Sequence, residues 1–144
     1  MTYRYEYPRP AVCVDIIVLN DDFTQILLIQ RKNNPFADCW ALPGGFVDEN
    51  EDLPDAAFRE LQEETGIQNI FLKQFKTYGT PGRDPRGHTV SVVYYGFCSK
   101  NTAFEAADDA KDAQWFLLKN LPVLAFDHKQ IMQDFCEKIL HNLG

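Results

Sequence analysis

The sequence predicts a mixed α/β domain, in which strands and helices alternate along the chain. Two observations support this class. Short β-branched and aliphatic runs are separated by turn residues, as strands are. Two longer stretches, one central and one C-terminal, instead repeat apolar residues every four positions, as amphipathic helices do. With 144 residues, the chain has the length of one ordinary domain, and we expect a single domain over 1–144.

The first two expected strands are the apolar runs 11–19 and 25–30, which the turn Asn20-Asp21-Asp22 separates. The run 11–19, with the sequence AVCVDIIVL, is expected to be a central strand. A polar stretch follows, and WALPGGFV then leads into an expected loop. Its two glycines, Gly44 and Gly45, let the backbone turn or approach a ligand closely.

The central helix is expected from about Leu53 to Thr65. Asp52 is placed to cap its N-terminus, with Asp55 at the N3 position, and Gly66 is placed to end it. Its core-facing stripe consists of Leu53, Ala57 and Leu61.

Three more strands are expected at 70–79, 89–98 and 113–118. The first two flank the Gly/Pro-rich loop GTPGRDPRGH, and an acidic loop at 105–112 precedes the third. The C-terminal helix opens with a capping-box spacing and places apolar residues at four-residue intervals. These residues are Asp127 and Gln130 for the box, and Ile131, Phe135 and Ile139 for the stripe.

Composition limits the classes of function. Fourteen Lys and Arg against 21 Asp and Glu give a net charge of −7, which argues against a nucleic-acid partner. The N-terminus has no apolar signal region, and no long apolar run predicts a membrane segment. The four cysteines include no CxxC pair, so no zinc site or disulfide framework is expected. We therefore expect a cytoplasmic protein in a reducing compartment.

Three carboxylates crowd the central helix. Glu60, Glu63 and Glu64 fan across roughly a 100° arc, although like charges at this spacing repel each other. One interpretation is a solvated acidic face, which is common on helices. The other is a site for a hard divalent cation such as Mg²⁺, which prefers carboxylate oxygens together with water and substrate phosphates.

The residues around these carboxylates resemble the signature of the Nudix hydrolases, which split diphosphates linked to another group. The matching positions read G45-x5-E51-x7-R59-E60-L61-x-E63-E64-x-G66-I67. The resemblance implies an α/β/α sandwich with a mixed β-sheet. It implies that Glu60, Glu63 and Glu64 bind Mg²⁺ or Mn²⁺, with the Gly45 carbonyl as a further ligand. It also implies that Arg59 and Glu51 brace the loop against the helix.

The resemblance does not identify the general base. Nudix enzymes differ in whether the base comes from the signature helix or from a later acidic loop. The candidates here are Glu64, Glu105, Asp108 and Asp109.

The stretch YGTPGRDPRGHTVSVVYYGF resembles ADP-ribose pyrophosphatases and related Nudix domains of NAD metabolism, including NrtR-type regulators. Arg83 and Arg86 in this stretch, and Arg31 near the second strand, are expected to contact substrate phosphates. The alternative is that Arg83 and Arg86 pair with Asp84 on a surface loop.

The sequence does not single out the residues that contact the nucleobase. Aromatic side chains either stack on a base or, as is more common, belong to the core. The aromatic candidates for base stacking are Phe36, Trp40, Phe46 and Tyr78. No role is assigned to His88 or His128.

The expected function is metal-dependent hydrolysis of ADP-ribose to AMP and ribose 5-phosphate. One alternative is another Nudix substrate, such as a different nucleotide sugar, NADH or an oxidised nucleoside triphosphate. A second is a non-catalytic ADP-ribose sensor. NrtR-type regulators carry a C-terminal winged helix, and the sequence stops at Gly144 soon after the expected sandwich. A homodimer is expected, with Tyr3, Tyr5 and Tyr7 packing either across its interface or over their own sheet.

Overall fold

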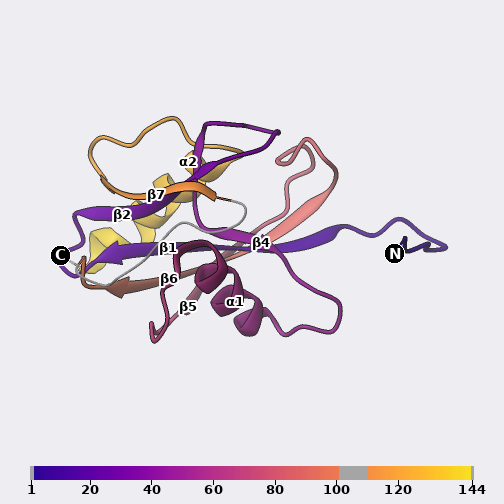
Figure 1. Cartoon of the computed structure of the whole chain (residues 1–144), viewed down its shortest axis with the longest axis horizontal. Coiled ribbons are helices and arrows are strands. Elements are labelled where there is room, and N and C mark those ends of the chain that lie inside the picture. The colour runs from indigo at the N-terminus through magenta and orange to yellow at the C-terminus, as the bar shows by residue number, and fades with distance from the viewer. Residues whose placement is uncertain (1, 101–109, 144) are drawn as a thin grey trace.

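The computed structural model describes residues 2–100 and 110–143. In these residues a mixed seven-stranded sheet lies between helix α1 on one face and the C-terminal helices on the other (Figure 1). The predicted α/β/α sandwich is therefore confirmed. The strands are β1 (Ala11–Asn20), β2 (Gln25–Arg31), β3 (Trp40–Ala41), β4 (Gly44–Phe46), β5 (Lys73–Tyr78), β6 (Thr89–Cys98) and β7 (Ala110–Leu117). The helices are α1 (Leu53–Thr65), α2 (His128–Phe135), the π-helix η1 (Cys136–Leu140) and α3 (His141–Leu143).

Strand β1 is central, as predicted, in the order β3-β2-β1-β6-β5. It pairs in parallel with β6 along its whole length and antiparallel with β2 and β4. Successive side chains of a strand point to opposite faces of the sheet, and here both faces are covered. Val14, Ile16 and Val18 belong to the cluster that packs under α1, while Ile17 and Leu19 belong to the cluster under α2.

Helix α1 has the predicted bounds. Asp52 caps it by accepting a hydrogen bond from the Leu53 N–H at 2.9 Å, not from the predicted N3 position. Gly66 ends it with φ of 75°, a left-handed conformation that glycine adopts without a steric penalty. The side chains of Ala57 and Leu61, on the core-facing side of the helix, are fully buried.

One predicted loop and the bounds of two predicted strands need correction. The segment after Pro43, predicted as a loop, forms strand β4, because β2 pairs with β1 only near Leu19 and leaves the backbone groups of Cys13 to Asp15 to be satisfied by another strand. The strand predicted at 70–79 begins at Lys73, and the last strand begins at Ala110.

The C-terminal helix buries Ile131 and Phe135 as its apolar spacing predicts. The predicted capping box is absent, because the Asp127 side chain makes no cap hydrogen bond and binds the Arg83 guanidinium instead. No helix in the described part of the chain is both long and apolar enough to span a membrane.

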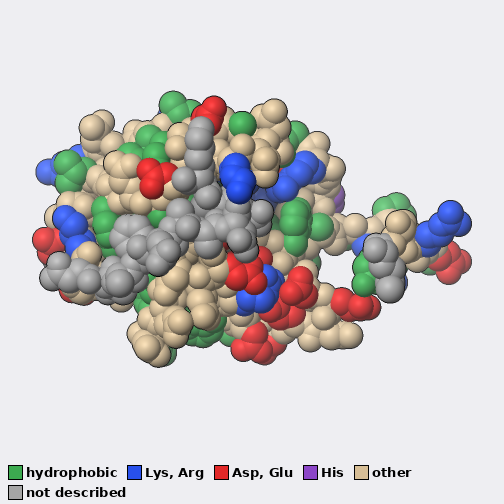
Figure 2. All heavy atoms as spheres, in the orientation of Figure 1, with side chains coloured by type: hydrophobic (Ala, Val, Ile, Leu, Met, Phe, Trp, Pro, Cys, Tyr) green, Lys and Arg blue, Asp and Glu red, His purple; other side chains and the backbone are tan. Residues whose placement is uncertain are grey.

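The N-terminal segment, residues 2–10, extends away from the sandwich (Figures 1 and 2). Tyr3, Tyr5 and Tyr7 are 54%, 51% and 71% exposed. Tyr3 donates a hydrogen bond to Glu49 at 3.2 Å, so the end of this segment contacts the loop before α1. The packing of these tyrosines across a dimer interface stays a prediction.

Candidate active site

A cavity of about 510 Å³ opens between α1, the β4 strand and the loop 79–88. It is lined by Arg31, Gly44, Gly45, Glu60, Glu64, Arg83 and Arg86, which are most of the residues expected at the site. Arg59 and Glu63 lie outside its lining. Acidic side chains gather on the surface over α1, with basic side chains beside them (Figure 2).

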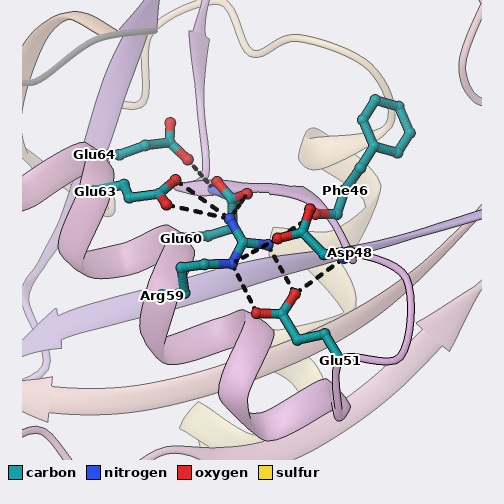
Figure 3. Close-up of polar contacts among 8 residues, drawn as sticks. Phe46, Asp48, Glu51, Arg59, Glu60, Glu63 and Glu64 are labelled. Atoms are coloured by element: carbon teal, nitrogen blue, oxygen red, sulfur yellow. Dashed lines mark hydrogen bonds and ion pairs between the residues drawn. The ribbon is translucent and has the colours of Figure 1, made fainter. Parts of the chain in front are cut away.

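Arg59 organises the acidic face of α1 (Figure 3). Its Nε and Nη2 donate to the two carboxylate oxygens of Glu51 at 2.7 and 2.9 Å, in the bidentate geometry that suits guanidinium and carboxylate. Nη2 also donates to the Phe46 carbonyl at 3.0 Å. Nη1 donates to Glu60 at 2.8 Å and, more weakly, to Glu63 at 3.3 Å. The Arg59 side chain thus joins the loop before α1 to two carboxylates of the helix. Its direct contact with Glu51 is the one that the sequence predicted.

These contacts shift the acidity of the carboxyl groups in opposite directions. Hydrogen bonds from Arg59 and from the Asp48 amide lower the pKa of Glu51 to about 2. Burial raises the pKa of Glu60, although its bond to Arg59 opposes the rise. Burial thus outweighs the Arg59 hydrogen bond in its effect on Glu60.

The two glycines let the carboxylates reach the backbone. The Gly44 N–H donates to Glu64 Oε1 at 2.8 Å. A Cβ at Gly45 would lie 2.5 Å from the Glu60 carboxyl group, and one at Gly44 would lie 2.2 Å from the Val14 carbonyl oxygen. Gly44 therefore excludes any larger residue, because its neighbours there include fixed backbone atoms. A side chain at Gly45 would instead displace the Glu60 carboxyl group, which is the mobile end of a long side chain.

The donor set suits a hard divalent cation, because Glu60, Glu63, Glu64 and the Gly45 carbonyl supply only oxygen. In the described residues, however, no three acidic, histidine or cysteine side chains are arranged as a ready metal cluster. Arg59 holds Glu60 and Glu63 instead. Glu63 is half-exposed, so its side chain is free to turn from Arg59 towards a cation. The metal ligands therefore remain a prediction.

The three expected phosphate-binding arginines differ in what holds them. Arg83 has a side chain only 4% exposed and binds Asp127 through two hydrogen bonds of 2.6 and 2.9 Å. Arg86 binds Asp84 in the same bidentate way, but its side chain is 44% exposed. The pairing expected in the alternative is found for Arg86 and Asp84, but Asp84 is buried and both residues line the cavity. Arg83 pairs instead with Asp127, which the sequence did not indicate.

Aromatic rings surround the exposed arginines. The Arg86 guanidinium lies 4.9 Å from the Phe46 ring centroid and 5.4 Å from that of Phe126. The Arg31 guanidinium lies 4.9 Å from the Phe126 ring centroid, and its Nε donates to the Pro35 carbonyl at 2.8 Å. Of the four aromatic residues considered for base stacking, only Phe46 lines the cavity, whereas Trp40 and Tyr78 pack in the core.

Sequence reasoning missed the floor of the cavity, which Asp15 and His128 form. Both residues are buried, at 7% and 3% exposed. The Asp15 carboxylate accepts a short hydrogen bond from Ser91 Oγ and lies 3.6 Å from His128 Nε2. Burial alone would raise the pKa of Asp15, but His128, Ser91 and Arg83 together lower it. The signal was present, because an aspartate inside the apolar run AVCVDIIVL requires a buried partner.

Three of the four candidates for the general base, Glu105, Asp108 and Asp109, lie outside the described residues. Glu64 is buried beside Gly44 and lines the cavity. Its carboxylate therefore faces the space where a substrate would bind.

Comparison with known proteins agrees with this geometry. The NUDIX domain model matches residues 9–135. The ADP-ribose pyrophosphatase of Methanocaldococcus jannaschii is 48% identical over 129 residues, which are 90% of this chain and 75% of that protein. The ADPR responsive transcriptional repressor NtrR of Acinetobacter baylyi is 38% identical over 136 residues, and the match spans 90% of this chain but only 54% of the repressor.

A solved structure shows the same fold with a ligand. The NUDIX domain of Shewanella oneidensis NrtR, crystallised with ADP ribose, superimposes with a TM-score of 0.84 at 33% identity. The superposition covers 92% of this chain and 90% of that one.

Proposed function

Because this chain belongs to the Nudix family and is a Nudix pyrophosphohydrolase, we propose that its substrate is ADP-ribose, which it hydrolyses to AMP and ribose 5-phosphate. The cavity supports this proposal, since Glu60 and Glu64 of α1 line the same space as Arg83 and Arg86 of the 79–88 loop. A diphosphate needs both, namely a site for cations that neutralise its charge and side chains that orient it. The name of the Methanocaldococcus jannaschii relative supports the choice of ADP-ribose.

The chain's own residues divide the work. Arg86 presents a partly exposed guanidinium to the phosphates, and its pairing with Asp84 and its contacts with two phenylalanine rings fix its direction. The backbone at Gly44 and Gly45 forms the wall against which the diphosphate lies. Glu64 is the candidate within the described residues for the group that takes the proton of the attacking water.

We propose that Glu60, Glu63, Glu64 and the Gly45 carbonyl hold Mg²⁺ or Mn²⁺. A bound divalent cation would neutralise phosphate charge and make a bound water more acidic. The all-oxygen donor set and the burial of the Glu60 carboxyl group, which raises its pKa, support this assignment.

The test is incubation of the purified protein with ADP-ribose and Mg²⁺ or Mn²⁺, with AMP and ribose 5-phosphate quantified by chromatography. We expect turnover that depends on the metal and is lost on chelation. In Glu63→Gln, kcat should fall by about 100-fold or more, because metal charge stabilisation is worth several kcal/mol. The exposed Glu137 provides the matched control, and Glu137→Gln should retain full activity. Absence of AMP at micromolar enzyme would refute the proposal.

A panel of substrates separates the alternatives within the same chemistry. ADP-ribose should give a higher kcat/KM than NADH, other nucleotide sugars or oxidised nucleoside triphosphates. A reversed order would keep the enzyme class and replace the substrate.

A second candidate function is ADP-ribose sensing, which the similarity to the Acinetobacter baylyi repressor favours. The same assay distinguishes the two functions. Tight ADP-ribose binding, measured by calorimetry in excess Mg²⁺, without release of AMP would identify a sensor.

A further inference from the structure

The turn Leu42–Gly45 is held from several sides by hydrogen bonds to its backbone. Ile16 N–H donates to the Pro43 carbonyl at 2.8 Å, and Glu64 accepts from the Gly44 N–H. A further contact comes from a side chain distant in sequence, because the Leu42 N–H donates to His128 Nδ1 at 3.1 Å. Gly44 and Gly45 also pair with strand β1. All of these contacts act on the segment that forms the wall of the proposed diphosphate site.

The contact with Leu42 fixes the tautomer of the His128 ring. An amide N–H donates only to a ring nitrogen that carries no hydrogen, so Nδ1 is unprotonated and the ring hydrogen lies on Nε2. Nε2 in turn faces Asp15 Oδ1 at 3.6 Å, where the carboxylate favours a hydrogen pointing towards it. Asp15 is itself fixed by Ser91 on the neighbouring strand β6.

The backbone around His128 is held as well. Asp127, the preceding residue, binds the buried Arg83 through two hydrogen bonds. The ring therefore has fixed partners at both nitrogens and a fixed attachment to the start of α2. Such an arrangement is more constrained than packing of a histidine ring in the core requires.

We propose that His128 is a positioning residue, which sets the Leu42–Gly45 turn at the correct distance from the carboxylates of Glu60 and Glu64 through its bond to the Leu42 amide. This proposal rests on the proposed function of the same site. It adds that the position of the Leu42–Gly45 turn depends on the Nδ1 acceptor of a residue 86 positions away from Leu42 in sequence.

Two substitutions separate positioning from packing. In His128→Asn the side-chain oxygen stands at the same bond distance from the backbone as Nδ1, so the acceptor for Leu42 is kept. In His128→Gln the amide group stands near the position of Nε2, so the Leu42 acceptor is lost. Glutamine fills more of the ring's volume than asparagine does. If His128 only packs in the core, His128→Gln should retain more activity. If His128 positions the turn, His128→Asn should retain more.

The measurements are kcat and KM for ADP-ribose, together with Mn²⁺ affinity from the electron paramagnetic resonance signal of the free ion. We expect His128→Asn to stay within about threefold of the wild type. We expect His128→Gln to lose about tenfold or more in kcat and in Mn²⁺ affinity, as changes in residues that orient metal ligands do, with KM less affected. His141, which is exposed on α3 and does not line the cavity, supplies the control, and His141→Asn should leave both values unchanged.

A reversed order of the two variants, or equal losses in both, would overturn the proposal. The structural part is tested without any activity by the ¹⁵N chemical shifts of the His128 ring. Nδ1 should show the shift of an unprotonated nitrogen and Nε2 that of a protonated one. The opposite tautomer would refute the Leu42 contact, whereas the predicted tautomer in a protein inactive on ADP-ribose would leave it standing and refute only the proposed substrate.

Discussion

The Glu60 carboxyl group lies against the backbone of Gly45, in the space that a side chain at residue 45 would occupy. A Cβ at Gly45 would lie 2.5 Å from the Glu60 carboxyl carbon and 2.5 to 2.6 Å from its oxygens. The carboxylate therefore rests directly on the backbone of β4. A side chain here would conflict with this neighbour and not with the backbone conformation, since Gly45 is not among the residues with positive φ.

Gly45→Ala should push the Glu60 carboxylate out of place and lower kcat/KM for ADP-ribose by about 100-fold, since small displacements of reacting groups have effects of this size. Steady-state kinetics of the purified variant checks this. Gly87 has open space around its Cα, so Gly87→Ala is the matched control and should behave as the wild type. Wild-type kinetics in Gly45→Ala would show that Glu60 does not act from this position.

Arg59→Lys should be destabilising although it keeps the charge. A lysine has no planar fork, so it cannot bind Glu51 through two bonds while also reaching Glu60 and the Phe46 carbonyl. The free energy of unfolding in urea should fall by about 1 to 3 kcal/mol, the usual range for lost hydrogen bonds to charged groups. The exposed Arg4 supplies the comparison, because Arg4→Lys should change nothing.

Glu51 should contribute to stability in a pH-dependent manner. Its pKa in the folded protein, about 2, is lower than the ordinary 4.5, so the folded state favours its charged form. The contribution is therefore complete above pH 4.5 and is lost as pH falls from 4.5 towards 2. The difference in unfolding temperature between wild type and Glu51→Gln should be largest near pH 6 and should shrink steadily below pH 4.5. A difference that is constant across this range would contradict the role given to Glu51.

Arg83 and Arg86 should have different roles despite their similar sequence setting. Arg83→Gln leaves the Asp127 carboxylate without its partner and should lower the free energy of unfolding by about 1.5 to 3 kcal/mol. Arg86→Gln should mainly raise KM for ADP-ribose. Combining Arg83→Gln with Asp127→Asn should cost less than the sum of the single changes, because the two residues interact. Additive losses would show that the pair is not coupled.

Much of the sandwich was predictable because the signals were local. The bounds of α1 follow from Asp52, Gly66 and the stripe Ala57 and Leu61, all within one short segment. The position of β1 follows from its apolar run, which only Asp15 interrupts, since a strand covered on both faces buries successive side chains, as β1 does from Cys13 to Asn20.

The failures came from partners distant in sequence. Asp127 reads as a helix cap, but Arg83, 44 residues earlier, takes its carboxylate. The glycine pair reads as a loop, but the unpaired edge of β1 recruits it as β4. The buried pair of Asp15 and His128 was missed for the same reason, because no spacing within the sequence shows that two residues more than 100 positions apart meet.

The central position of β1 also determines which part of the molecule opens last. Its backbone amides bond to β6, β2 and β4, and its side chains from Cys13 to Asn20 are buried, so exchange at these amides requires the sandwich itself to open. Deuterium should therefore replace the amide protons at Val14 and Ile16 more slowly than those of the extended N-terminal arm. The platform beneath the candidate active site then persists through partial unfolding, and ligand release does not require it to loosen.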